Sequence, residues 1–262
     1  MLIDSHTHLD MEEFDPDRDK VIDIAASVGV KRIITVGIDV KSSIAGIKLT
    51  QTYPSIFATV GIHPHNADIS TKEDFEQISL LVNNKKVIAI GEIGLDFYRN
   101  RSSMQNQIKL FKQQLEIAIY LDLPVVIHVR EAHDDTIKIL FSFKRKLSKG
   151  VIHCFSGDYN LAKTYIELGY HISIPGTVTY KNASQIQDVA GRIPLNNIIL
   201  ETDSPFLAPV PYRGKRNEPS YIVNTALKIA KIRGVPFEKI SGQTTQNVCK
   251  LFNLPYLENN EI

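Results

Sequence analysis

The chain has 262 residues, of which 43% are hydrophobic and 23% are charged, and this composition excludes a disordered or fibrous protein. Its 30 basic and 29 acidic residues leave a formal net charge of +1, so an anionic partner must be held by local charges. The N-terminus lacks a signal pattern, and no stretch approaches the roughly 18 apolar residues of a membrane span, so we expect a soluble, cytoplasmic protein without a membrane partner.

Short apolar, β-branched runs alternate with stretches of helical periodicity along the chain. In chain order we expect a strand that starts at Leu2 and ends at His6 or His8, helix 17–28, strand 32–38, helix 43–53, strand 56–62, helix 71–82, strand 87–92, a helix with an apolar stripe from Met104 to Ala118, strand 124–128, helix 134–143, strand 150–154, helix 159–168, strand 171–174, helix 184–189, strand 198–201 and helices 220–233 and 237–252.

This alternation predicts a parallel sheet, either open and doubly wound or closed into a barrel. An open sheet of the nucleotide-binding kind carries a glycine-rich phosphate loop after its first strand, and none is present there. Eight strand and helix units without a linker instead favour an α/β fold in one domain, residues 1–262. We predict a (β/α)8 TIM-type barrel with helices at the C-terminal end.

Histidines and carboxylates gather at the carboxyl ends of the expected strands, which is the face where such barrels place their active sites. Six of the eight strands end in one or two of them: His6, His8, His63, His65, Glu92, His128, His153, Glu201 and Asp203. At the opposite ends only His171 occurs, and it is interpreted as structural. The uneven distribution indicates a site at the carboxyl rim.

Residues two apart on a strand share a side, which pairs the rim residues with apolar neighbours inside the barrel. Their expected interior partners are Val126 for His128, Val151 for His153, Ile88 and Ile90 for Glu92, and Ile199 with Glu201 for Asp203. Each rim residue could by itself be a hydrogen-bonded core residue. Six convergent residues are better explained by metal binding, because buried charges must be paired or bound to a metal.

Charge counting favours two divalent ions. Four neutral imidazoles with two carboxylates, two divalent ions and a bridging hydroxide leave one net positive charge, which suits a phosphodiester anion. Glu92 is the natural bridge between the ions, and Asp203 could bind one ion and act as general base. Zn, Mn, Mg or Co would each suit mixed imidazole and carboxylate ligands.

Two loops at the expected rim carry arginines interleaved with aromatic residues, at 97–101 and 212–217. Aromatic rings can stack on bases, and guanidinium groups bind phosphates. Tyr98, Arg213 and Arg216 are therefore candidate substrate-binding residues, and Arg130 is expected on the same rim. Alternatively, these loops are polar only because they face solvent.

Five motifs together resemble those of the TatD family of metal-dependent deoxyribonucleases. They are Asp4-Ser5-His6-Thr7-His8-Leu9-Asp10, Gly91-Glu92-Ile93-Gly94-Leu95-Asp96-Phe97-Tyr98, His153-Cys154-Phe155-Ser156-Gly157, Glu201-Thr202-Asp203-Ser204-Pro205 and Arg213-Gly214-Lys215-Arg216-Asn217-Glu218-Pro219. The similarity extends from residue 4 to the helices after residue 220.

The resemblance implies a metallohydrolase barrel that cleaves DNA phosphodiester bonds by attack of a metal-bridging hydroxide. The implied substrate is DNA, single-stranded or at 3' ends, and the implied activity is that of an exonuclease. The motifs carry over the metal ligands His6, His8, Glu92, His128, His153 and Asp203. His63 matches a family histidine that we assign to the phosphate or to an auxiliary ligand position. Relatives that bridge their metals with a carbamylated lysine have it where this chain has Glu92, which argues against a dihydroorotase-like activity.

Two other functions remain open at this point. The chain could be a metal-dependent esterase or amidohydrolase, such as an aminoacyl-tRNA deacylase, or a non-catalytic nucleic-acid-binding module with structural metal. Structural metal sites close their coordination shell, whereas six ligands shared between two ions leave open positions. The residues do not determine the oligomeric state, for which a monomer is the simplest expectation.

Overall fold

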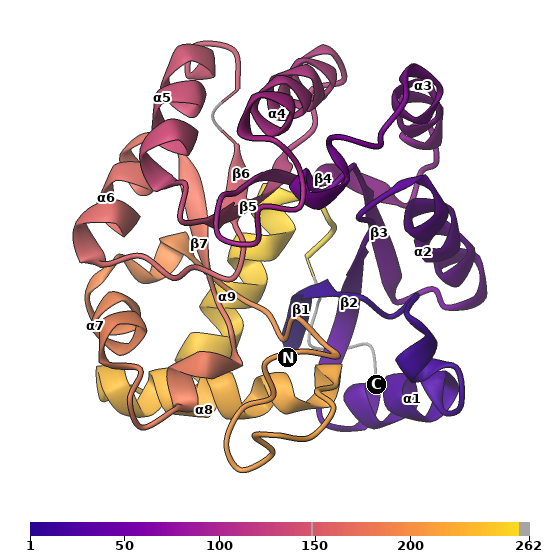
Figure 1. The fold of residues 1–262 in the computed structure, drawn as a ribbon. Coiled ribbons are helices and arrows are strands. Elements are labelled where there is room, and N and C mark those ends of the chain that lie inside the picture. The colour runs from indigo at the N-terminus through magenta and orange to yellow at the C-terminus, as the bar shows by residue number, and fades with distance from the viewer. Residues whose placement is uncertain (148, 257–262) are drawn as a thin grey trace.

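The computed structural model of the chain describes residues 1–147 and 149–256. Eight parallel strands follow one another around a single sheet in chain order (Figure 1). The strands are β1 (Leu2–Thr7), β2 (Val30–Val36), β3 (Ile56–Val60), β4 (Val87–Asp96), β5 (Val125–Arg130), β6 (Gly150–Ile152), β7 (Tyr170–Ile174) and β8 (Ile198–Leu200).

Helices alternate with the strands and surround the sheet, as Figure 1 shows. They are α1 (Arg18–Ser27), α2 (Val40–Thr52), α3 (Lys72–Leu81), α4 (Met104–Tyr120), α5 (His133–Phe143), α6 (Tyr159–Glu167), α7 (Ser184–Arg192), α8 (Ile222–Arg233) and α9 (Phe237–Leu251). None of the described helices is long and apolar enough to cross a membrane.

The sheet closes between its first and last strands. The N–H of Asp203 donates to the carbonyl of His6 (2.9 Å), and the N–H of His8 donates to the carbonyl of Ser204 (2.8 Å). Thr7 and Ser204 form a parallel bridge at the same place. The predicted (β/α)8 barrel is thus confirmed, and its closure lies among the residues that were expected to bind metal.

Two apolar clusters make up the core. The larger one lies between the sheet and the surrounding helices, and the smaller one joins inward-facing strand residues to α9. Val126, Val151, Ile88 and Ile199 belong to the smaller cluster, which confirms their expected interior positions.

The prediction for Ile90 is wrong, because Ile90 belongs to the outer cluster. The register of β4 against β5 shifts between Ile90 and Ile93, so the simple alternation of sides does not continue from Ile90 to Glu92.

Most element boundaries agree with the sequence within a few residues, but β4 does not end at Glu92. It continues to Asp96, and Gly94 to Asp96 pair with His128 to Arg130 of β5. Gly94 permits this pairing, because its φ is +136° and a Cβ there would lie 2.1 Å from the carbonyl oxygen of His128. Gly94 therefore allows the two strands to approach closely beyond Glu92.

Two buried glutamines of α4 hold the strand ends in place. The amide of Gln114 exchanges two hydrogen bonds with the backbone of Ile62, beside His63 (2.7 and 2.9 Å). The amide of Gln107 does the same with the backbone of Asp96 (2.9 and 3.1 Å). These bonds connect the apolar packing of α4 to the geometry of the carboxyl rim.

Candidate metal centre

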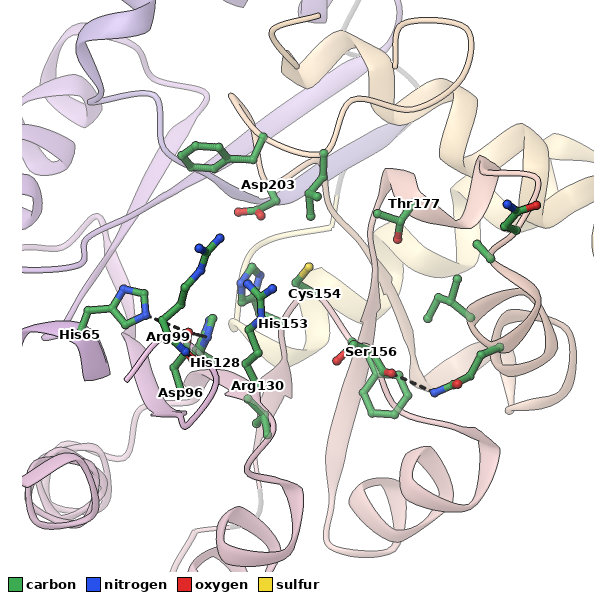
Figure 2. A pocket seen from close by; sticks show the side chains of 18 of the residues that line it. His65, Asp96, Arg99, His128, Arg130, His153, Cys154, Ser156, Thr177 and Asp203 are labelled. Carbon is green, nitrogen blue, oxygen red and sulfur yellow. Dashed lines mark hydrogen bonds and ion pairs between the residues drawn. The ribbon is translucent and has the colours of Figure 1, made fainter. Parts of the chain in front are cut away.

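The six predicted ligands converge at the carboxyl rim of the barrel. His6 lies in β1 and His8 directly after it, Glu92 lies in β4, His128 in β5, His153 directly after β6, and Asp203 three residues after β8. His128, His153 and Asp203 face the same opening in Figure 2. Five of the six predicted ligands are buried, with exposed fractions from 1% at His6 to 9% at Asp203. The sixth, His128, is half-buried.

Glu92 occupies the middle of this group. Its Oε2 lies 3.4 Å from His6 Nε2 and 3.9 Å from His8 Nε2. Its Oε1 lies 2.8 Å from His128 Nδ1 and 3.4 Å from His153 Nε2. The two oxygens of one carboxylate are therefore directed at two different sets of imidazoles.

Two triads of donor atoms lie at the centre, and Glu92 is a member of the second. In the first, donor atoms of His6, His8 and Asp203 lie within 4.8 Å of one another. In the second, donor atoms of His63, Glu92 and His128 also lie within 4.8 Å of one another. His63 Nε2 is 3.4 Å from Glu92 Oε1. His63 is thus brought to the centre, as expected.

The chemistry of these donors fits divalent metal. The Nε2 atoms of His6 and His8 face each other at 3.4 Å, and Asp203 Oδ1 lies 3.7 and 3.5 Å from them. These separations exceed the usual 2.7–3.2 Å of a strong hydrogen bond, so the donors surround a common space. Imidazole nitrogens and carboxylate oxygens in this arrangement suit a transition metal.

The protonation of the cluster follows from burial and neighbouring charge. Burial alone would raise the pKa of Glu92, but the nearby histidines, His153 and His63 first, hold it well below its usual range. Burial lowers the pKa of His63 to about 4. An ionised carboxylate and a neutral imidazole are the forms that bind metal.

His153 behaves differently from His63. Burial lowers its pKa, but the carboxylates of Glu201 and Glu92 outweigh burial and raise the pKa to about 10. A metal ion at this imidazole would therefore displace a proton.

Further polar groups orient the imidazoles from behind. Glu201 Oε2 is 3.2 Å from His153 Nδ1, and the carbonyl of Val36 is 3.1 Å from His8 Nδ1. Asp96 Oδ2 lies 2.8 Å from His65 Nε2 and 3.3 Å from His128 Nε2. Such contacts determine which ring nitrogen faces a metal.

Asp96 was not recognised as part of the site from the sequence. It follows Glu92 by four residues inside a motif that was noted, but the strand was expected to end at Glu92. Recognition of Gly94 as a strand residue would have placed Asp96 at the rim.

Asp4 lies beneath the centre and is not among the clustered donors. Its Oδ1 accepts a hydrogen bond from the N–H of Thr202 (2.9 Å), and its Oδ2 is 2.6 Å from the Thr202 hydroxyl. Burial raises its pKa well above the usual range. Asp4 therefore connects β1 to the segment after β8.

The other predicted substrate-binding residues are not among the clustered donors. The Tyr98 ring packs against the guanidinium of Arg130, with the guanidinium carbon 4.2 Å from the ring centroid. Arg213 packs on Tyr180 in the same way at 4.4 Å. Arg216 forms two hydrogen bonds with the carboxylate of Asp17 (2.8 and 2.7 Å), so its charge is already paired.

A pocket of about 830 Å³ opens beside the donor atoms. His128, His153 and Asp203 form its inner end, and Arg99 and Arg130 line it as well (Figure 2). This volume lies within the range of about 300–1,000 Å³ found for ligand pockets.

A (β/α)8 barrel with histidines and carboxylates clustered at its carboxyl rim is typical of metal-dependent hydrolases. The sequence model of the family described as TatD related DNase matches residues 3–253, and the chain belongs to this family.

Curated relatives and a solved structure cover nearly the whole chain. An uncharacterised metal-dependent hydrolase, YabD of Bacillus subtilis, is 38% identical over 97% of this chain and 100% of its own length. The 3'-5' ssDNA/RNA exonuclease TatD of Salmonella typhimurium is 32% identical, with the same coverage of both chains. The crystal structure of YjjV, a TatD homologue from Escherichia coli, superimposes with a TM-score of 0.92 at 32% identity and covers 97% of this chain and 98% of its own.

Proposed function

We propose that this metal-dependent hydrolase cleaves DNA phosphodiester bonds as an exonuclease that acts on single-stranded DNA or on 3' ends. The observation that carries the proposal is the position of Glu92, whose two carboxylate oxygens are directed at separate sets of imidazoles. The name of the Salmonella relative, a 3'-5' ssDNA/RNA exonuclease, supports this substrate class.

Two divalent ions, each Zn, Mn, Mg or Co, are part of the proposal. His6, His8 and Asp203 would hold one ion, His128 and His153 the other, and Glu92 both. Such ions supply Lewis acidity at phosphoryl oxygens and lower the pKa of water. His63 would contact the phosphate or serve as an auxiliary ligand.

Asp203 is the proposed proton acceptor. Burial would raise its pKa, but the neighbouring histidines, His8 first, lower it below the usual range, so the carboxylate is ionised near neutral pH. The side chain lines the pocket, where it can accept the proton of an attacking water molecule at a carboxylate oxygen.

Three further expectations complete the proposal. The protein would act in the cytoplasm, as a monomer, with residues 1–262 as one domain. The continuous eight-stranded sheet supports the single domain within the described residues.

Substitution of the two carboxylates tests the function directly. Glu92→Gln and Asp203→Asn keep the shape of each side chain and remove its negative charge. We expect each to lower kcat/KM for end-labelled single-stranded DNA by about 10²–10⁴-fold, since metal binding or proton transfer is lost. A chelator should abolish the wild-type activity, and added Mn, Zn, Co or Mg should restore it.

The substrate panel should include duplex DNA, RNA and an aminoacyl-tRNA ester, with thermal unfolding as the control for folding. Hydrolysis of the aminoacyl ester without phosphodiester cleavage would assign the protein to the esterase class. Full DNA cleavage by folded Glu92→Gln protein would falsify the proposed roles.

A further inference from the structure

The pocket beside the candidate metal centre has two unlike walls. Arg99 and Arg101, from the segment after β4, and Arg130, the last residue of β5, form a basic wall. Phe155, which follows β6, Ile186 of α7 and Phe206, which follows β8, form an apolar wall. Figure 2 shows Arg99 and Arg130 extending from the rim into the pocket. A charged wall and an apolar wall suit a ligand with a phosphate on one side and a base on the other.

The three arginines of the basic wall have no partner for their charge among the described residues. None forms an ion pair or a side-chain hydrogen bond there, whereas Arg18, Arg192 and Arg216 each pair with an aspartate. The arginines of the basic wall, Arg99, Arg101 and Arg130, are all exposed. Guanidinium groups that line a pocket without a carboxylate partner can offer their N–H donors to an anion.

Tyr98 supports two of these guanidinium groups. The guanidinium carbons of Arg130 and Arg99 lie 4.2 and 5.8 Å from the centroid of its ring. Contacts at these distances are attractive and restrict where the cations lie. Tyr98 is therefore a positioning residue for the basic wall.

Asp96 links the basic wall to the metal centre. Its Oδ1 accepts hydrogen bonds from the N–H groups of Tyr98 (3.0 Å) and Arg99 (2.8 Å). Its Oδ2 lies 3.3 Å from His128 Nε2. One carboxylate thus orients a proposed metal ligand and holds the turn that leads to Arg99 and Arg101, so it links the position of His128 to that of these two arginines.

We propose that Arg99, Arg101 and Arg130 bind a phosphate next to the scissile phosphate, and that the apolar wall contacts the adjoining base. This inference rests on the proposed nuclease function and deepens it. The preferred substrate is then a strand with at least two successive phosphates. A diester with a single phosphate would use the metal centre without the basic wall.

Cleavage of two substrates tests the inference. The metal-loaded enzyme is assayed with a single-stranded oligonucleotide and with bis(p-nitrophenyl) phosphate, which has one phosphate only. For Arg99→Ala/Arg130→Ala protein we expect KM for the oligonucleotide to rise at least tenfold more than KM for the small diester. Equal losses on both substrates, or no loss on either, would overturn the inference.

Arg192→Ala is the control, because it removes one positive charge from an exposed arginine outside the pocket, at the end of α7. It should leave both KM values unchanged. Tyr98→Phe should also keep the wild-type KM for the oligonucleotide, since the ring remains, whereas Tyr98→Ala should raise it. A loss of the same size in both Tyr98 variants would contradict the positioning role.

Binding measured without turnover separates this inference from the proposed function. The probe is a fluorescent single-stranded phosphorothioate oligonucleotide, and anisotropy is recorded with metal-loaded enzyme over a range of salt concentrations. The slope of log Kd against log salt is compared between the wild type and Arg99→Ala/Arg101→Ala/Arg130→Ala protein. The slope of the triple variant should be smaller by about 0.7 for each phosphate that it no longer neutralises.

The two proposals fail in different ways. If the wild type binds with a steeper slope than the triple variant but cleaves neither DNA nor RNA, the phosphate-binding role of the basic wall is supported and the proposed nuclease function is wrong. If the enzyme cleaves DNA and the slope of the triple variant equals that of the wild type, the basic wall is wrong and the nuclease function stands.

Discussion

At the scale of single residues, identical side chains in this protein have opposite acid–base behaviour. Burial lowers the pKa of His63 to about 4, whereas at His153 the carboxylates of Glu201 and Glu92 outweigh burial and raise the pKa to about 10. The difference comes from the charges that surround each ring. Sequence alone, which identifies both residues as rim histidines, does not contain this information.

The effect of burial on a histidine pKa can be tested at His133, which is not one of the proposed metal ligands. Burial lowers its pKa, and its Nδ1 is 3.0 Å from the hydroxyl of the buried Tyr165. The unfolded chain therefore takes up a proton at this residue as pH falls through about 6.5, while the folded protein takes it up only at lower pH. We expect the free energy of unfolding to fall between pH 7 and 5, and the fall to be shallower in His133→Gln protein.

Denaturant unfolding at several pH values measures this difference. Tyr165→Phe is the control, because it removes the hydroxyl and leaves the titrating ring. It should cost about 1 kcal/mol at pH 7 and keep the wild-type pH dependence. Identical pH dependence in wild type and His133→Gln protein would contradict the assignment.

At the scale of elements, the pairing of β4 with β5 decides the geometry of the site. Glu92 and His128 come from these two strands, and their closest atoms are 2.8 Å apart. The pairing continues beyond Glu92 only because Gly94 lacks a side chain. A local change in β4 therefore acts on residues of both strands.

Two glycine substitutions should have opposite effects. At Gly94, alanine would bring its Cβ to 2.1 Å from the carbonyl oxygen of His128, so we expect Gly94→Ala to lower the melting temperature and the metal content. Gly242 lies within α9 with no atom near its would-be Cβ, so Gly242→Ala should stabilise the protein by roughly 0.5–1 kcal/mol. Thermal unfolding and metal analysis of both variants check this, and a Gly94→Ala protein with wild-type stability would refute it.

At the scale of the whole molecule, α9 completes the inner core of the barrel. Val248, Cys249, Leu251 and Phe252 pack with the inward residues of the strands. The Asn247 amide donates hydrogen bonds to the carbonyls of Leu195 (2.8 Å) and Ile198 (2.7 Å), at the start of β8. The last helix thus stabilises the end of the barrel opposite the site.

Loss of this packing should affect stability more than catalysis. Phe252 is 3% exposed, and Phe252→Ala should lower the free energy of unfolding by about 3–5 kcal/mol, because a cavity remains in the core. Activity per folded molecule should stay near that of the wild type. Denaturant unfolding and kcat/KM at low temperature measure the two quantities. A large loss of kcat/KM in fully folded protein would show that α9 also influences the rim.

The sequence by itself determined the alternation of strands and helices, the barrel and the rim positions of the six proposed ligands. These features depend on short-range periodicity and on the rule that parallel strands end at one face. The family motifs support the same rim positions, because the motifs lie at the same strand ends.

Only the tertiary structure decided which rim residues lie in contact with one another. Asp96 reaches His128 because of a register shift and a glycine in β4, and Arg216 is paired with Asp17, 199 positions earlier in the chain. Arg99, Arg101 and Arg130, and not Arg213 and Arg216, line the pocket beside the donors. Such contacts depend on register and packing between distant segments, which local sequence patterns do not specify.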